Sequence, residues 1–180
     1  MTLAPPPILC DVHELASGIP EMLALRYPVV TQEMPLADYG LVDVAQRCIL
    51  VERKSASDLL SSISDGRLRS QLDRLQAPEV DAPFLLVEDE FRIHDGEVDT
   101  RTKATRGRSG HSLVTTYRHS KFDFPYIVTL LVRTLYLTRI RVLWSADREG
   151  SAHIIGALYR TSLRWPILLD GSQIYITEDE

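Results

Sequence analysis

The chain has 180 residues, with 20 lysines and arginines against 25 aspartates and glutamates, and a formal net charge of −5. This length favours a single domain, and the 44% hydrophobic and 25% charged residues exclude a disordered chain, a collagen and a coiled coil. Two cysteines, Cys10 and Cys48, exclude a disulfide scaffold and a zinc site of several thiolates. The acidic net charge argues against a general nucleic-acid coat, but it leaves room for a local basic site.

Targeting and membrane signals are absent from the sequence. No apolar run reaches 18 residues, so we expect no spanning helix and no membrane partner. The first residues lack the basic and apolar stretches of a signal peptide, so we expect an intracellular, cytoplasmic protein, with a nucleoid or nuclear location left open. We expect three parts, namely a flexible lead-in at 1–7, a domain at 8–165 and a C-terminal tail at 166–180.

The first half of the chain alternates short apolar runs with helical patterns. In chain order we expect a strand at 8–12, a helix at 19–26, and strands at 29–34, 38–43 and 48–53. A helix should follow, capped by Ser55 or by Ser57, and Gly66 should separate it from a second amphipathic helix.

The second half begins with another buried strand. We expect, in order, a strand at 83–89, a hairpin at 91–100, a mobile loop at 101–120 that leads into a short helix, an apolar helix at 125–137, a strand at 139–144 and a helix at 147–160. The hairpin is indicated by the Asp95-Gly96 pair, and the last helix by the capping residue Asp147. Strands that alternate with helices predict an α/β domain.

Candidate chemistry gathers at the end of the strand 48–53. Side chains alternate between the faces of a strand, so Glu52 and Lys54 should point one way and Arg53 the other. The neighbouring strand begins at Asp38, and the turn between the two strands can bring it beside Glu52. Two carboxylates on adjacent strand ends suit Mg²⁺ or Mn²⁺, and a nearby lysine suits a water or a phosphate oxygen. These groups fit hydrolysis of a phosphodiester. The alternative is a solvated strand end.

The segment 52–58 (Glu-Arg-Lys-Ser-Ala-Ser-Asp), preceded by Asp38-Tyr39, resembles the signature of the XPF family of structure-specific DNA endonucleases. That signature is Gly-Asp, a spacer, Glu-Arg-Lys, three residues and Asp. The segments 10–14 and 147–152 agree more weakly with flanking family patterns, and the resemblance covers about 8–160.

The resemblance implies a restriction-endonuclease-like fold with a mixed central sheet flanked by helices. It implies Mg²⁺- or Mn²⁺-dependent cutting of one strand of branched DNA (a flap or fork) near a duplex/single-strand junction, as in DNA repair. Asp38 and Glu52 then match the metal ligands. The matched active-site positions are Asp11, Asp38, Glu52, Arg53, Lys54 and Asp58. Asp58 also has a structural alternative, since it lies in the first turn of a helix.

The chain departs from the family in three ways. Ala37 stands where the family has glycine, and His13 where it has arginine, so a fixed cation near the scissile phosphate is replaced by a weaker one. Within these 180 residues we find no helicase motif, and we expect no helix-hairpin-helix module after the last helix. Duplex anchoring would then fall to this domain, a second subunit or a separate protein.

Basic residues suggest where DNA would bind. Residues 92–121 hold seven basic and three acidic side chains, a net charge of +4, which suits contact with a phosphate backbone. The alternative there is a solvated loop. The candidate DNA-binding residues are His13, Arg67, Arg106 and Arg108.

Two helices suggest a homodimer, which the family resemblance also implies. The helix 125–137 is apolar around most of its circumference, whereas a surface helix shows one stripe. The candidate interface residues are Tyr126, Leu130, Ile155 and Tyr159. The alternative is burial of both helices inside one chain. For the function, the alternative is a non-catalytic DNA-binding or scaffold subunit of a nuclease complex, and retention of Asp38, Glu52 and Lys54 argues against it.

Overall fold

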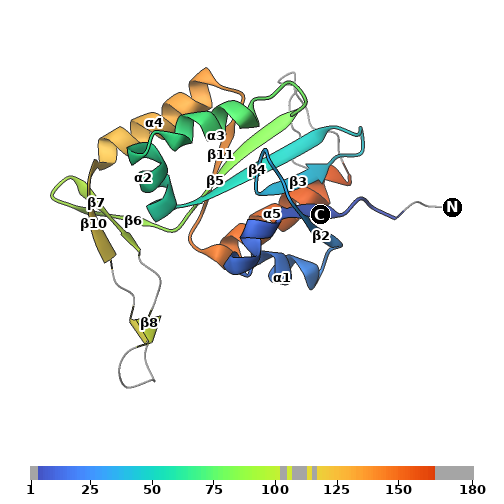
Figure 1. Cartoon of the computed structure of the whole chain (residues 1–180), viewed down its shortest axis with the longest axis horizontal. Helices are drawn as coiled ribbons and strands as arrows, with labels where there is room; N and C mark the ends of the chain where they lie inside the picture. Colours follow the sequence, from blue (N-terminus) through green and yellow to red (C-terminus); the bar gives the residue numbers. More distant parts are fainter. Residues whose placement is uncertain (1–3, 102–104, 107–112, 115–116, 165–180) are drawn as a thin grey trace, which may run out of the picture.

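A mixed sheet of six strands forms the centre of the computed structural model, which describes residues 4–101, 105–106, 113–114 and 117–164 (Figure 1). The strand order is β11-β5-β4-β3-β1-β2. The strands are β1 (Ile8–Asp11), β2 (Val29–Gln32), β3 (Tyr39–Val42), β4 (Cys48–Ser55), β5 (Ala82–Glu88) and β11 (Arg141–Ser145). Strands β4, β5 and β11 are parallel, and β3 runs antiparallel to both of its neighbours. The expected α/β class with a mixed sheet is therefore confirmed.

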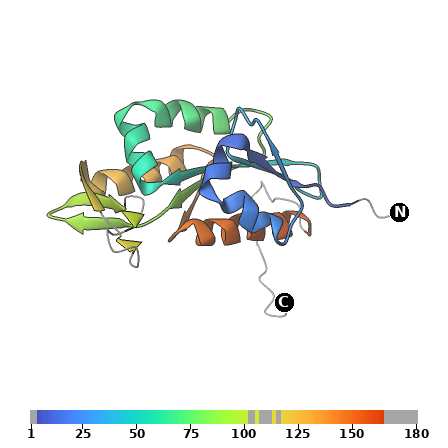
Figure 2. The ribbon, with the colours of Figure 1, turned by 60° about the horizontal axis from the view of Figure 1, so that its bottom comes forward.

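Helices cover both faces of this sheet (Figures 1 and 2). They are the 3-10 helix η1 (Val12–Ser17), α1 (Ile19–Ala24), α2 (Ala56–Ser64), α3 (Arg67–Leu75), α4 (Phe124–Leu137) and α5 (Arg148–Ser162). Alternation along β4 explains the two layers. Ile49 and Val51 pack in a cluster with α1 and α5, whereas Leu50 packs in a second cluster with α2, α3 and α4.

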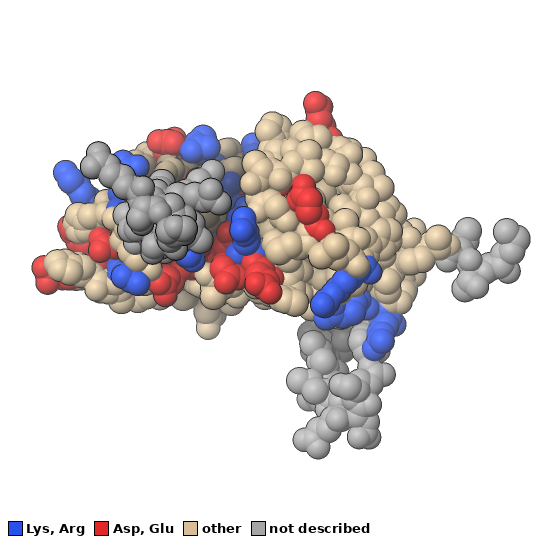
Figure 3. All heavy atoms as spheres, turned by 90° about the horizontal axis from the view of Figure 1, so that it is seen from below, with Lys and Arg blue, Asp and Glu red and all other residues tan. Residues whose placement is uncertain are grey.

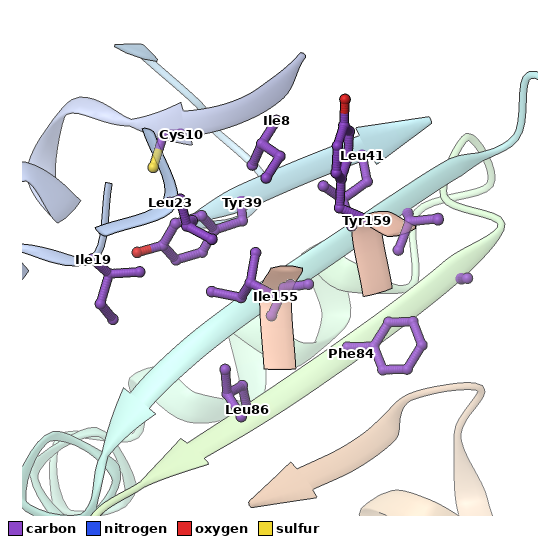
Figure 4. Packing of buried hydrophobic residues seen from close by; sticks show 13 residues of the cluster. Ile8, Cys10, Ile19, Leu23, Tyr39, Leu41, Phe84, Leu86, Ile155 and Tyr159 are labelled. Atoms are coloured by element: carbon purple, nitrogen blue, oxygen red, sulfur yellow. The ribbon is translucent and has the colours of Figure 1, made fainter. Parts of the chain in front are cut away.

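The two residues of α5 that were predicted at a dimer interface are buried inside the monomer. Ile155 is 0% and Tyr159 3% exposed, and Figure 4 shows Ile155 between Tyr39 and Leu86. A Cβ on Gly156 would lie 2.8 Å from the Tyr27 ring, so the helix approaches its neighbour as closely as a glycine allows. The prediction that Ile155 and Tyr159 form a dimer interface is therefore wrong, because their apolar side chains face the sheet of their own chain.

A second sheet leaves the body after β5. Its order is β10-β7-β6, and its strands are β6 (Phe91–His94), β7 (Glu97–Arg101) and β10 (Tyr117–Asp123). The hairpin at Asp95-Gly96 is confirmed, with φ of 52° and 85° at these residues, as a two-residue turn with positive φ at both positions requires. We call this sheet the arm. Short strands β8 (Thr105–Arg106) and β9 (Leu113–Val114) pair with each other.

The expectation of a loop leading into a short helix at 101–120 is wrong where the structure describes that segment. Strand β10 begins at Tyr117 and pairs with β7, with His119 opposite Asp99. Most side chains of β10 are exposed, so no alternating apolar pattern marked it as a strand.

Part of the N-terminal lead-in is bonded to helix α5. In the lead-in, the carbonyl of Pro6 accepts a hydrogen bond of 2.9 Å from the Tyr159 hydroxyl. The proposed tail at 166–180 lies outside the described residues. Within the part that is described, we find no helix with the length and apolar character that a membrane crossing needs.

Candidate active site

Strand pairing brings the two candidate carboxylates together. The Asp38 amide donates to the Val51 carbonyl at 3.1 Å, and the Asp38 carboxylate accepts from the Arg53 amide at 2.7 Å. Asp38 therefore bonds to the residues on either side of Glu52, which places it opposite Glu52 on the neighbouring strand. By alternation along β4, Glu52 shares the face of Leu50, which α2 and α3 cover. The predicted grouping of Asp38 with Glu52 at adjacent strand ends is present in the structure.

Asp38 holds a proton more tightly than an ordinary aspartate. Burial and the negative charge of Glu52 raise its pKa from 3.8 to about 7, with a further rise from Glu14. The Arg53 amide and the charge of Lys54 lower the pKa, but by less. A carboxyl group pushed toward neutral pH by a second carboxylate gains from a nearby cation, because the cation relieves the repulsion.

Lys54 is the cation beside this pair. Its Nζ lies 2.8 Å from Glu52 Oε1, and both side chains are largely buried. This contact follows from the spacing of two residues, which places both side chains on one face of β4. Lys54 thus balances one carboxylate and leaves the two carboxylates and the lysine with one net negative charge.

Arg53 points away from this group, as the alternation predicts. Its Nε donates to Glu88 Oε2 at 2.7 Å, and its NH1 lies 3.2 Å from Glu14 Oε2. Desolvation opposes the charged guanidinium, but Glu88 and Glu14 outweigh it and raise the pKa of Arg53 above its ordinary value. The side chain of Arg53 therefore lies across the sheet from the two carboxylates and bonds to two other acids.

Asp11 lies next to Asp38 in the sheet, since its amide donates to the Asp38 carbonyl at 2.8 Å, but its carboxylate is bonded to other groups. Its Oδ1 accepts from the His13 amide at 2.8 Å and lies 2.6 Å from His13 Nδ1, and its Oδ2 accepts from the Met34 amide at 2.7 Å. Burial raises its pKa, but these hydrogen bonds prevail and hold the pKa below the usual value. Asp11 caps η1, and the His13 side chain beside it is 89% exposed.

Asp58 and Arg67, two further predicted residues, lie on the surface. Asp58 is exposed, with its Oδ2 accepting from the Ser55 hydroxyl at 2.8 Å while its amide donates to that hydroxyl at 3.2 Å. These contacts agree with the structural alternative for Asp58, a role in the first turn of α2. They also identify Ser55 as the N-cap of α2. Arg67 bonds to Asp65 at 2.9 Å on the surface. Arg106 lies in β8, and Arg108 lies outside the described residues.

The replacement of glycine at position 37 is tolerated by the backbone. Ala37 is not among the described residues with positive φ, so a glycine is not required for conformational reasons. Its methyl group is buried in the cluster that contains Leu50.

Reasoning from the sequence did not group the buried polar residues around Arg53. The Tyr39 hydroxyl donates to Glu14 Oε2 at 2.7 Å, and the Ser151 hydroxyl donates to Glu88 Oε2 at 2.7 Å. The sequence does suggest a cation near Glu88, because this acid ends a strand that is otherwise apolar and a buried carboxylate needs a partner. The contacts of Glu14 and Ser151 join distant segments and leave no local pattern.

The carboxylate oxygens of Asp38 and Glu52 are suitable ligands for a divalent metal ion. Mg²⁺ in proteins commonly takes one or two carboxylates and completes its shell with water and substrate phosphates, which Asp38 and Glu52 fit. Among the described residues, no group of three or more histidine, cysteine or acidic side chains is arranged to hold a metal. Asp38 and Glu52 could therefore hold such an ion only together with oxygen atoms from water or substrate.

Such a sheet, with two carboxylates and a lysine at one strand end, defines a restriction-endonuclease-like α/β domain. The chain belongs to the ERCC4 domain family, which matches residues 10–158. It is similar to the 3'-flap repair endonuclease Xpf of Saccharolobus solfataricus, 42% identical over 45% of this chain and 33% of that protein. It is also similar to DNA repair protein rad16 of Schizosaccharomyces pombe, 27% identical over 86% of this chain and 15% of that protein.

Solved structures agree with this family. XPF from Aeropyrum pernix in complex with DNA is 28% identical, with a TM-score of 0.61 over 87% of this chain and 65% of that one. A second structure of XPF from Aeropyrum pernix is 27% identical, with a TM-score of 0.64 over 97% and 68% of the two chains. The XPF resemblance and the restriction-endonuclease-like fold are thus confirmed. The chain spans a third or less of the two curated relatives described above.

Proposed function

We propose that this chain is a metal-dependent DNA endonuclease that nicks branched DNA near duplex/single-strand junctions. The observation that supports the proposal most is the grouping of Asp38, Glu52 and Lys54 on one face at the end of β4. The family and the relatives named as flap-repair and DNA-repair nucleases support the same activity.

Each residue has a distinct task in this proposal. Asp38 and Glu52 would hold Mg²⁺ or Mn²⁺, which would polarise the phosphoryl group and lower the pKa of a bound water. Lys54, which lies beside Glu52, would hold the attacking water or a phosphate oxygen. Arg53 and Asp11 contribute by fixing the backbone around this group, and Asp58 by accepting a hydrogen bond from Ser55, which caps α2.

DNA contact is assigned to the surface around this site. The described part of the arm carries acidic and basic side chains in mixture (Figure 3), so a continuous basic face is not what we propose there. The proposed backbone contacts are His13, Arg67, Arg106 and Arg108. A separate protein would supply any further duplex anchoring.

A homodimer is part of the proposal, with α4 as its interface. Val128, Val132 and Leu135 recur at helical spacing on α4, and all three are exposed. Tyr126 is 50% exposed, whereas Leu130 packs partly against the core of its own chain. An exposed apolar stripe of this kind favours self-association, because burial of apolar area against a second copy removes it from water.

A substrate panel tests the activity. Purified protein is incubated with labelled duplex, single-stranded, flap and fork DNA in Mg²⁺, in Mn²⁺ or in EDTA. We expect nicks in the flap and fork strands in either metal, and none in EDTA. Binding without nicks in any metal would favour the alternative of a non-catalytic DNA-binding subunit.

A further inference from the structure

A buried polar cluster surrounds Arg53 on the face of the sheet opposite to the proposed metal ligands. Its guanidinium is held by Glu88 and Glu14, and these acids are bound in turn by hydroxyl groups. The members come from six elements, η1, β3, β4, β5, β11 and α5. We call Glu14, Tyr39, Arg53, Glu88, Ser145 and Ser151 the Arg53 cluster.

The cluster is closed by short contacts. Glu14 lies 3.2 Å from Arg53 NH1 and accepts from the Tyr39 hydroxyl at 2.7 Å. On the other side, the Ser151 hydroxyl donates to Glu88 at 2.7 Å and lies 2.6 Å from the Ser145 hydroxyl. The side chains of Arg53 and Glu14 are each 13% exposed and that of Glu88 is 7% exposed. Water therefore has little access to these contacts.

One peptide group connects the cluster to the site. The side chain of Arg53 is fixed by the cluster, while its amide donates to the Asp38 carboxylate at 2.7 Å on the other side. Its chain neighbours, Glu52 and Lys54, carry the rest of the site. A rotation of this peptide would therefore move the Asp38 contact and the placement of Glu52 together.

Stability alone does not account for this arrangement. Two carboxylates share one guanidinium, which leaves one excess negative charge in a largely buried place. Buried ion pairs cost desolvation energy and are often replaced by apolar side chains without loss of stability. Here the neighbouring residues Val51 and Leu86 already belong to an apolar cluster that could extend over the site of Arg53.

We propose that Glu14 is a positioning residue for the carboxylate site, acting with Tyr39 through the guanidinium of Arg53. It anchors the peptide whose N–H orients Asp38, and so sets the separation at which Asp38 and Glu52 share an ion. The inference rests on the proposed function, because it takes these two carboxylates as the metal ligands. Glu14 does not touch the metal or the DNA in this scheme.

Two variants test the proposal in the full chain. Glu14→Gln keeps the shape and removes the charge, and Tyr39→Phe removes only the hydroxyl that orients Glu14. We expect the NMR resonance of the Arg53 amide proton to move upfield in both, because its bond to Asp38 lengthens. Mn²⁺ affinity, measured by calorimetry, should fall about 10-fold. In cleavage, kcat should fall while KM for DNA stays the same.

Tyr159→Phe is the matched control. It makes the same substitution in the same apolar cluster, but its hydroxyl bonds to the Pro6 carbonyl and not to the Arg53 cluster. The control should keep the wild-type amide resonance and Mn²⁺ affinity. If Glu14→Gln fails to fold, the amide resonance and Mn²⁺ affinity of Tyr39→Phe alone test the proposal.

Two outcomes would overturn the inference. One is wild-type amide resonance and Mn²⁺ affinity in the variants, and the other is an equal change in Tyr159→Phe. A wild-type protein that neither binds Mn²⁺ nor cuts DNA would overturn the proposed function instead. The shift of the Arg53 amide would still show whether Glu14 and Tyr39 position Asp38.

Discussion

At the scale of single residues, Asp38 makes the stability of the metal-free protein depend on pH. Its pKa is raised from 3.8 to about 7, so between these values the folded state binds a proton that the unfolded state has released. Stability therefore falls as pH rises through this window. Asp38→Asn removes this dependence. Between pH 4 and pH 8 we expect wild type to lose on the order of 2–4 kcal/mol relative to the variant.

Urea unfolding at several pH values, in EDTA, measures this difference. Titrating groups that do not interact with Asp38 are common to both proteins and cancel in the comparison. Parallel curves of stability against pH for the two proteins would contradict the raised pKa.

The sequence predicted the position of a side chain where its contacts are local, and it did not where the contacts join residues far apart in the chain. The opposite directions of Glu52 and Arg53 follow from strand alternation, which is local and was predicted correctly. What Arg53 meets is set by Glu14 and Glu88, which lie 39 and 35 positions away along the chain. Asp11 matched the family motif, yet its hydrogen bond to the His13 amide follows from a 3-10 helix that no periodicity indicated, and its bond to the Met34 amide joins residues 23 positions apart.

At the scale of elements, the start of α2 lies directly beside the site, since Ser55 follows Lys54. The Ser55 hydroxyl accepts from the Asp58 amide at 3.2 Å and caps the helix. We expect Ser55→Ala to lower the free energy of unfolding by about 1 kcal/mol. Chemical denaturation measures the loss.

Ser61→Ala in the same helix is the control. Its hydroxyl donates to the carbonyl of Ser57 within the helix at 3.0 Å, so the change should stay within about 0.5 kcal/mol. Equal losses in both variants would show that the hydroxyl of Ser55 has no special role as a cap.

The elements differed in how well their sequence patterns identified them. Helices α4 and α5 were predicted close to their observed bounds, and α3 was predicted as an amphipathic helix after Gly66, because each has apolar residues at helical spacing. β10 was missed because the partner strand β7, rather than an apolar core, determines its conformation. The apolar face of α5 was predicted to pack against a second chain, but it packs against the sheet of its own chain. Periodicity identifies an apolar face but not what covers it.

At the scale of the whole molecule, the exposed stripe on α4 should control assembly. Val132 and Leu135 are 48% and 51% exposed. We expect light scattering at micromolar concentration to give about twice the 20.4 kDa of one chain. Val132→Glu combined with Leu135→Glu should give a single-chain mass, because the interface would then bury unpaired charges.

Leu25→Glu serves as the control for assembly. Leu25 is 83% exposed on α1's C-terminal side, on the opposite face of the sheet, and its substitution should leave the mass unchanged. A wild-type mass of one chain that does not change with concentration would contradict the homodimer.

The central claim, that Asp38 and Glu52 carry metal-dependent DNA cleavage, is tested most directly by one rate measurement. The initial rate of nicking of a labelled flap DNA in Mn²⁺ is compared for wild type, Glu52→Gln and the variant Glu21→Gln, which changes an exposed acid of α1. We predict equal rates for wild type and Glu21→Gln, and a loss of at least about 100-fold for Glu52→Gln, with folding and DNA binding retained. Cleavage by Glu52→Gln at the wild-type rate would contradict the claim.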